Sequence, residues 1–191
     1  MSALVAKELT VARGGRVLVE ELSFAVERGG ALVVTGPNGA GKSSLLRVLA
    51  GLGRAAAGTL LVPAFRAWLG EQTALDPERR LHEALLFWAK TDPAPDALGR
   101  VAAALDEAAL SGLADVPVRL LSTGQRRRAA FARVVASGAD CWLLDEPASG
   151  LDSTAVARLE AAIARHRTAG GVVAVATHQP LALPDAVSVG L

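Results

Sequence analysis

Three short apolar runs stand out in the pattern of hydrophobic and polar positions along the chain. They cover residues 31–35, 141–144 and 172–177, and glycine or polar residues bound each one. Short runs rich in β-branched or bulky residues are typical of buried β-strands. Strands that are apolar on both faces usually belong to parallel sheets covered on both sides. The pattern therefore predicts a buried, mainly parallel sheet.

Segments with helical periodicity separate these strands. They cover residues 42–50, 124–136 and 154–168. Such alternation of strands and helices indicates an α/β fold. The amphipathic N-terminal stretch, residues 4–26, instead predicts an antiparallel β-patch whose hairpin turn is formed by Gly14 and Gly15.

The middle of the chain has a different composition. Residues 73–120 are rich in Ala, Leu, Asp and Pro and predict helices, with a break at residues 91–95 (Thr-Asp-Pro-Ala-Pro). We expect one domain, in which residues 1–72 and 121–191 form the α/β core with its β-patch. Residues 73–120 would form a helical subdomain inserted into that core.

Charge and composition limit the partners and the cellular compartment that the chain is expected to have. The 191 residues carry a formal net charge of +1, which gives no sign of a nucleic-acid footprint. The single cysteine, Cys141, lies in an apolar run, so there is no disulfide framework and a reducing compartment fits. No signal peptide and no run near the roughly 20 apolar residues of a membrane span is evident. We therefore expect a soluble chain that relies on another chain for any membrane helices.

A phosphate-binding loop follows the first apolar run and precedes a helical segment. The sequence fits G-x-x-x-x-G-K-[ST] at every position, in the structural context that this motif requires. Glycines let backbone N–H groups point at phosphate oxygens, and the helix N-terminus adds its positive end. Lys42 is expected to reach the β- and γ-phosphates, and the Ser43 hydroxyl to ligate Mg²⁺. The residues assigned to nucleotide binding are Gly36, Pro37, Asn38, Gly39, Ala40, Gly41, Lys42, Ser43 and Ser44.

Two acids, Asp145 and Glu146, follow the second apolar run. At the carboxyl end of a strand beside a nucleotide, one acid can hold Mg²⁺ and the next can orient or deprotonate the attacking water. We assign Asp145 to Mg²⁺ and Glu146 to the catalytic base. Two solvated acids that cap a strand are the alternative, which the phosphate loop upstream disfavours. Cys141 and Trp142 are interpreted as core residues.

A second anion-binding element is predicted at residues 121–125 (Leu-Ser-Thr-Gly-Gln). Ser122 and Gln125 fit a capping box, so a helix should begin here, and Gly124 leaves its end open to a ligand. One bound ATP needs only one phosphate cradle. Two cradles suggest a head-to-tail dimer, in which each ATP lies between the phosphate loop of one chain and Ser122, Gly124 and Gln125 of the other. An ordinary capped helix is the alternative.

Together with residues 126–133, this segment resembles the signature motif and helix of ABC ATPases. Residues 145–152 resemble the Walker B motif and the D-loop of that family, with Asp152 in the D-loop. His178, after the third apolar run, resembles the switch histidine that contacts the γ-phosphate. Gln72 resembles the Q-loop glutamine that senses Mg²⁺ and couples hydrolysis to the membrane partner. The resemblance implies an ATPase that uses ATP and Mg²⁺, with Gln72, Glu146 and His178 as catalytic residues and with Ser43, Gln72 and Asp145 around the metal.

One segment departs from the family pattern. ABC ATPases usually stack adenine on an aromatic residue ahead of the phosphate loop, but residues 11–16 contain none. The guanidinium plane of Arg13 or Arg16 could stack on the base instead.

Three other features have ordinary structural interpretations. The basic run at residues 126–128 could grip nucleic-acid phosphates, but beside apolar helix positions it is expected to be a solvated face, and no nucleic-acid partner is expected. His82 and His166 have no partners at ligand spacing and are expected at the surface. The apolar and aromatic residues 85–88 either contact a membrane subunit or pack the core of the helical subdomain.

Two further segments resemble one subfamily, the ATP-binding subunits of the cytochrome c biogenesis (haem export) system. They are residues 115–125, which lead into the signature, and residues 177–181 (Thr-His-Gln-Pro-Leu). The resemblance implies a peripheral subunit at the cytoplasmic face of the inner membrane, working with integral-membrane permease subunits and a second ATPase subunit. ATP hydrolysis would drive haem export or the release of a haem-loaded chaperone. The ATPase subunit of another small-substrate ABC exporter or importer is the alternative.

The sequence does not show the features expected of other classes of phosphate-loop protein. A soluble ABC ATPase that acts on nucleic acid or ribosomes would normally carry two cassettes or a long coiled-coil or basic insertion. A GTPase would need a guanine-reading segment such as Asn-Lys-x-Asp, and a kinase would need a substrate lid. The sequence has no Cys-x-x-Cys-His motif, so the chain itself is expected to bind no haem.

Overall fold

The computed structural model describes residues 2–191, which form two compact units. The first unit consists of the described part of Met1–Trp68 together with Asp140–Pro147 and Ile163–Leu191, and the second consists of Leu69–Ala139 and Ala148–Ala162. Neither unit is therefore one continuous stretch of chain. No helix within residues 2–191 combines the length and the apolar character needed to cross a membrane.

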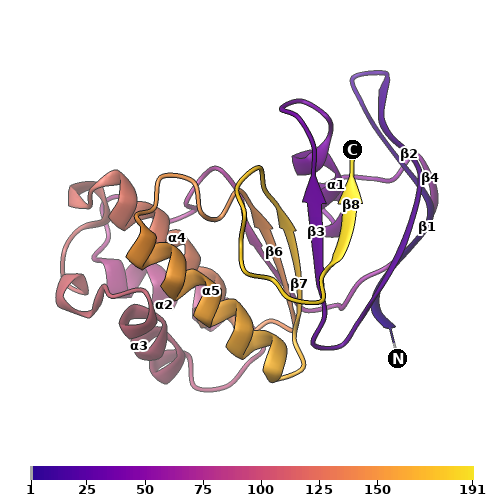
Figure 1. Ribbon diagram of the computed structural model, residues 1–191. Helices are drawn as coiled ribbons and strands as arrows, with labels where there is room; N and C mark the ends of the chain where they lie inside the picture. The colour runs from indigo at the N-terminus through magenta and orange to yellow at the C-terminus, as the bar shows by residue number, and fades with distance from the viewer. Residues whose placement is uncertain (1) are drawn as a thin grey trace. The chain divides into compact units, whose positions relative to one another are not determined.

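The amphipathic N-terminal segment forms an antiparallel sheet in the first unit (Figure 1). Strand β1, Ser2–Arg13, lies between β2, Arg16–Glu27, and β4, Ala57–Leu61. Gly14 and Gly15 form the turn between β1 and β2 with φ angles of 58° and 78°, which glycine adopts without the steric cost of a side chain. The predicted β-patch and its glycine turn are confirmed.

The apolar runs form the centre of a second sheet in the order β5-β6-β7-β3-β8. Its strands are β3 at Ala31–Thr35, β5 at Arg66–Leu69, β6 at Cys141–Asp145, β7 at Val172–Ala176 and β8 at Val187–Gly190. Strand β7 pairs in parallel with both β3 and β6, and every residue of β7 is buried. The predicted buried parallel sheet is confirmed. The carboxyl ends of β3, β6 and β7 therefore meet at one edge, where open α/β sheets bind their ligands.

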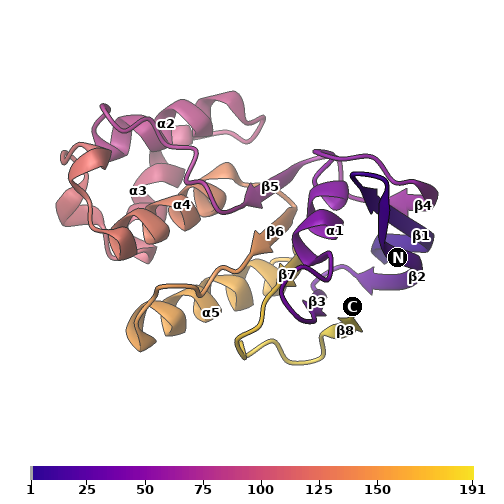
Figure 2. The same ribbon diagram turned by 90° about the horizontal axis from the view of Figure 1, so that it is seen from above.

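Helix α1, Lys42–Leu49, packs against β1, β6 and β7 (Figure 2). Its residues Leu45, Leu46 and Leu49 are fully buried in one cluster with Leu32 of β3. Burying a leucine side chain contributes about 1.5–3 kcal/mol. The core thus fixes the helix whose first residues carry the phosphate-binding motif.

The second unit is built on helices. They are α2 at Leu81–Thr91, α3 at Ala97–Glu107, α4 at Thr123–Ser137 and the short 3₁₀ turns η1 at Ser111–Leu113 and η2 at Val118–Leu120. Helix α3 packs against both α2 and α4, and Asp96 caps α3 by accepting the Gly99 N–H at 3.0 Å. Helix α5, Ser153–Thr168, begins in this unit and ends in the first.

The apolar and aromatic residues 85–88 divide between core and surface. Leu85 is fully buried, and Leu86 and Trp88 pack partly buried against the same core. Phe87, in contrast, is 51% exposed. The core interpretation therefore holds for Leu85, while the Phe87 ring lies at the surface.

The basic run at residues 126–128 is not a solvated face, and that prediction is wrong. Each guanidinium donates to a backbone carbonyl: Arg126 to Leu121 at 2.7 Å, Arg127 to Gly70 at 2.9 Å, and Arg128 to Ala108 at 2.8 Å. Carbonyls at the ends of helices and strands lack partners within their own element, and a guanidinium can satisfy them. The three arginines therefore join separate segments of the second unit.

The surface position predicted for His166 is also wrong. Its ring stacks on Trp142 of β6, with ring centroids 4.0 Å apart and planes 8° from parallel. This packing lowers the pKa of His166 from its ordinary value of 6.5, because burial penalises the charged imidazolium. The core position predicted for Cys141 is confirmed, and burial raises the pKa of this thiol to about 12.

Candidate nucleotide-binding site

The loop between β3 and α1 needs glycine at both of its ends. Gly36 has a φ of 143°, and a Cβ there would lie 2.7 Å from the Leu191 carbonyl oxygen. Gly41, the residue before α1, has a φ of 113°, and its Cβ would lie 3.0 Å from the Cβ of Leu18. Side chains at these positions would force the loop apart. The backbone can therefore turn tightly and present its N–H groups beside the N-terminus of α1.

Lys42 supplies the positive charge of this loop. Its Nζ donates to the carbonyl oxygens of Gly36 at 2.7 Å and Pro37 at 3.1 Å. The side chain is only 6% exposed, so the ammonium group is held inside the loop. A fixed cation beside the backbone of this loop is suited to a bound polyphosphate.

Ser43 and Asp145 bring two oxygen atoms together at the start of α1 and the end of β6. The Ser43 hydroxyl donates to Asp145 Oδ1 at 3.0 Å. Mg²⁺ in nucleotide sites takes one or two protein oxygens and completes its shell with phosphate and water. This hydroxyl–carboxylate pair at the phosphate loop fits that requirement.

Glu146 and His178 form a second pair at the ends of β6 and β7. Glu146 Oε2 lies 2.8 Å from His178 Nδ1 and also accepts the backbone N–H of His178 at 3.4 Å. The Glu146 backbone N–H donates to the Ala176 carbonyl at 2.9 Å, and its φ is 48°, an uncommon angle for a residue with a side chain. These bonds hold the carboxylate in place next to Asp145, with 26% of its side chain exposed to an incoming water.

A tight turn after β7 sets the position of His178. Thr177 accepts the Gln179 N–H at 3.0 Å and donates to the Gln179 carbonyl at 2.9 Å. The turn borders a cavity of about 580 Å³ that Gly36 and Asp185 also line. Thr177 was placed within residues 177–181 but given no role in this turn, although a threonine that bonds to the backbone two residues on is a known turn signal.

In the second unit, the capping box predicted at residues 122–125 is confirmed. Ser122 Oγ accepts the Gln125 N–H at 3.2 Å, and Gln125 Oε1 accepts the Ser122 N–H at 2.8 Å. A Cβ on Gly124 would lie 3.7 Å from the Gly150 carbonyl oxygen, so these two glycines are neighbours. Close by in sequence, Asp152 caps α5 by accepting the Ala155 N–H at 2.8 Å.

Gln72 is exposed in the segment that follows β5. The carbonyl of Gly70 accepts from Arg127, and the carbonyl of Ala74 accepts from the Trp88 indole N–H at 2.6 Å. Arg127 and Trp88 were not expected to contact the segment around Gln72. No local motif predicts these bonds, because each acceptor is a backbone carbonyl that lies far in sequence from its donor.

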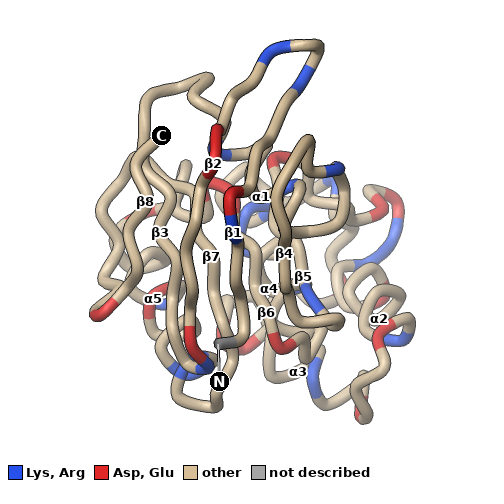
Figure 3. The backbone as a smooth tube through the Cα atoms, turned by 90° about the vertical axis from the view of Figure 1, so that its right-hand side faces the viewer, with Lys and Arg blue, Asp and Glu red and all other residues tan. Residues whose placement is uncertain are grey.

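The arginines considered for adenine stacking lie at the β1–β2 turn, where Figure 3 shows basic residues on both arms. Arg13 and Arg16 are both exposed. Arg13 also lines a cavity of about 200 Å³, together with Ser44 and Arg47 of α1. One of the two arginines therefore shares a cavity with a residue that directly follows the phosphate loop.

Each unit gathers a different set of the predicted residues. The first unit contains Lys42, Ser43, Asp145, Glu146 and His178, and within this set Ser43 contacts Asp145 and Glu146 contacts His178. The second unit contains Gln72, Ser122, Gly124, Gln125 and Asp152.

Comparison with known proteins places these motifs in one family. The model of the ABC transporter family matches residues 19–149. A cytochrome c biogenesis ATP-binding export protein, CcmA, from Sphingopyxis alaskensis is 57% identical over 91% of this chain and 88% of its own length. The CcmA of Gluconobacter oxydans is 48% identical over 94% of this chain and 82% of its own length. A solved structure of an ATP-binding subunit of an ABC transporter has the same fold, with a TM-score of 0.84 and 22% identity over 93% of this chain and 80% of that one.

Proposed function

Because this chain belongs to the ABC transporter family of ATP-hydrolysing subunits, we propose that it hydrolyses ATP at the carboxyl edge of its parallel sheet. Two contacts at this edge of the sheet support the assignment of the residues that bind and hydrolyse ATP. Ser43 donates to Asp145 at 3.0 Å, and Glu146 lies 2.8 Å from His178. One pair suits a metal-bound phosphate and the other suits a water held beside it.

Residues 36–43 of the loop, together with Ser44, would bind the phosphates of ATP. The loop amides and the N-terminus of α1 bind the phosphate oxygens, and Lys42 neutralises charge on the β- and γ-phosphates. Ser43, Asp145 and Gln72 would hold Mg²⁺, which would supply positive charge to offset the charge that develops on the phosphates. Arg13 or Arg16 would stack on adenine in place of an aromatic ring.

Glu146 would act as the general base. Its carboxylate accepts the proton of the attacking water, or orients that water, as the bond to the γ-phosphate forms. Nδ1 of His178 lies 2.8 Å from the Glu146 carboxylate, and Nε2 of the same ring would contact the γ-phosphate. Gln72 would be the third residue of this catalytic set.

A second chain would complete each site. Ser122 Oγ accepts a hydrogen bond from its own helix, so its hydroxyl hydrogen remains free to donate to a γ-phosphate. Gly124 and Gln125 lie at the same helix N-terminus, which favours an anion. We therefore propose a head-to-tail dimer, with Asp152 in the D-loop beside it. Residues 73–120 would serve as the helical subdomain of a core formed by residues 1–72 and 121–191.

The dependence of ATPase rate on protein concentration tests the shared site. If two chains build each site, the ATPase rate per chain should rise steeply with protein concentration and then level off once most chains are in dimers. A Ser122→Ala variant should plateau at a much lower rate. A rate per chain that stays constant over a hundredfold dilution would contradict the two-chain site.

The CcmA relatives point to the transport system. We propose that this subunit works with integral-membrane permease subunits at the cytoplasmic face of the inner membrane, and that its hydrolysis drives haem export or haem-chaperone release in cytochrome c biogenesis. Purification of the tagged chain from detergent-solubilised membranes tests this. Recovery with cytochrome c maturation subunits supports it, and recovery with the permease of another small-substrate transporter instead would refute it.

A further inference from the structure

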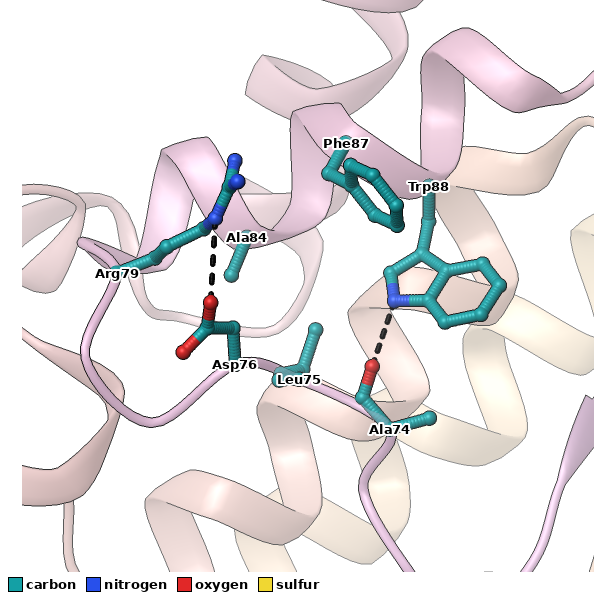
Figure 4. A pocket seen from close by; sticks show the side chains of 7 residues that line it. All are labelled: Ala74, Leu75, Asp76, Arg79, Ala84, Phe87 and Trp88. Carbon is teal, nitrogen blue, oxygen red and sulfur yellow. Dashed lines mark hydrogen bonds and ion pairs between the residues drawn. The ribbon is translucent and has the colours of Figure 1, made fainter.

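The segment that carries Gln72 is held at both ends by side chains from two helices. At its start, the Arg127 guanidinium of α4 donates to the Gly70 carbonyl at 2.9 Å. At its end, the Trp88 indole of α2 donates to the Ala74 carbonyl at 2.6 Å, as Figure 4 shows. The exposed side chain of Gln72 lies between these two anchors. The backbone on either side of the glutamine is therefore fixed by hydrogen bonds.

The end of this segment is strained. Ala74 has a φ of 55°, in the left-handed region that residues with a Cβ rarely occupy. Such a conformation persists only where neighbouring contacts over-determine it. The bond from Trp88 reaches the carbonyl of this same residue. Without it, the segment would be free to relax, and Gln72 would move with it.

The Trp88 ring is itself firmly held. Phe87 packs on it edge to face, with ring centroids 5.6 Å apart, and the Arg133 guanidinium lies 5.3 Å from its centroid. The ring also forms part of the wall of a cavity of about 250 Å³ that Leu75 and Ala84 line (Figure 4). One indole thus joins the wall of this cavity to the backbone beside Gln72.

We propose that Trp88 is a positioning residue for Gln72. It acts through the Ala74 carbonyl, Arg127 acts in the same way through Gly70, and together they present the glutamine in one place. This inference rests on the proposed function, in which Gln72 is catalytic.

Trp88→Phe is the informative change, because it keeps an aromatic ring over the cavity and removes the N–H donor. We expect kcat for ATP hydrolysis to fall by about tenfold with little change in KM, since a misplaced catalytic group slows chemistry more than it weakens binding. Arg127→Met should have the same effect from the other end. Thr91→Val is the matched control: Thr91 donates to the Trp88 carbonyl at 2.7 Å in the same helix, so its loss removes a hydrogen bond without freeing residues 70–74.

A double variant decides whether Trp88 acts through Gln72. In a Gln72→Ala background, Trp88→Phe should cause no further loss of kcat, because there is no glutamine left to position. An equal loss in both backgrounds, or a Trp88→Phe variant with the kcat of the parent, overturns the inference while the catalytic role of Gln72 stands. A Gln72→Ala variant with the parent rate instead overturns the role of Gln72 in the proposed function, and the inference with it.

Discussion

Ser122 combines two roles that substitution can separate. Its Oγ caps α4 by accepting the Gln125 N–H at 3.2 Å, and its hydroxyl hydrogen is proposed to meet the γ-phosphate bound by a second chain. Ser122→Ala removes both roles, whereas Ser122→Asp keeps the cap, because aspartate is as good a capping residue as serine and favours the helix dipole. Ser122→Asp should therefore be more stable than Ser122→Ala but less active.

The magnitudes follow from the position of the residue. Loss of the cap in Ser122→Ala should cost about 1 kcal/mol, which lowers Tm by roughly 2–4 °C in a chain of this size. In Ser122→Asp, the Tm should stay level or rise. A carboxylate about 4 Å from one phosphate charge costs about 4 kcal/mol at an effective dielectric of 20, which corresponds to roughly a thousandfold weaker ATP-bound dimer. The more stable variant should thus be the less active one.

Differential scanning fluorimetry and ATPase rates on the same preparations check this. Asp96→Ala is the matched control, because Asp96 caps α3 in the same unit and lies outside the proposed site. That variant should lose stability and keep its ATPase rate. If Ser122→Asp hydrolyses ATP within twofold of the parent, no phosphate comes close to Ser122, and the shared site is refuted.

Three further predictions follow from single side chains. Glu146→Gln should lower kcat by about 10²–10⁴-fold and leave an ATP-bound dimer on size-exclusion chromatography, because the neutral amide cannot take the proton; a monomer in saturating ATP would contradict the assignment. The pKa of His166 is lowered in the folded chain, so the unfolded chain binds its proton first, and stability should fall as the pH drops below about 6.5. Urea titrations at pH 7.5 and 5.5 should show this loss in the parent and a smaller one in His166→Phe; equal losses in both would exclude His166 as the cause. With its pKa raised to about 12, the Cys141 thiol should react with a thiol reagent at pH 8 only after unfolding, and rapid labelling of the native chain would show that it is not buried.

The central sheet and the phosphate loop could be predicted from sequence because their signals are local. An apolar run such as Val172–Ala176 is buried whatever surrounds it, and the loop motif follows its strand directly. Strands β4, β5 and β8 were not predicted. In β4 and β8 most residues are exposed, so neither carries an apolar run. Their pairing is decided by a neighbour, as when Leu61 pairs with Val5 of β1.

The errors arose where tertiary packing decides the environment of a polar side chain. His166 was expected at the surface because it has no partner at ligand spacing in the sequence, yet it stacks on Trp142 of β6. Arg127 was expected in solvent, yet it donates to Gly70 on a distant segment. A bond from a side chain to a backbone carbonyl leaves no pattern in the acceptor's sequence, and ring stacking between residues 24 positions apart leaves none either, so neither contact could be predicted before the fold was known.

The order of strands in the parallel sheet has a consequence for how the chain is made. Within residues 2–191, strand β3, which leads into the phosphate loop, pairs only with β7 and β8, the last two strands in sequence order. Val33 meets Val175 roughly 140 residues later, and at about 5–20 residues per second a ribosome needs about 7–28 s to deliver that partner. During this interval an apolar strand has no neighbour on either edge, which exposes the nascent chain to aggregation. The loop that follows β3, which is proposed to bind ATP, can therefore reach its final shape only after β7 has been synthesised.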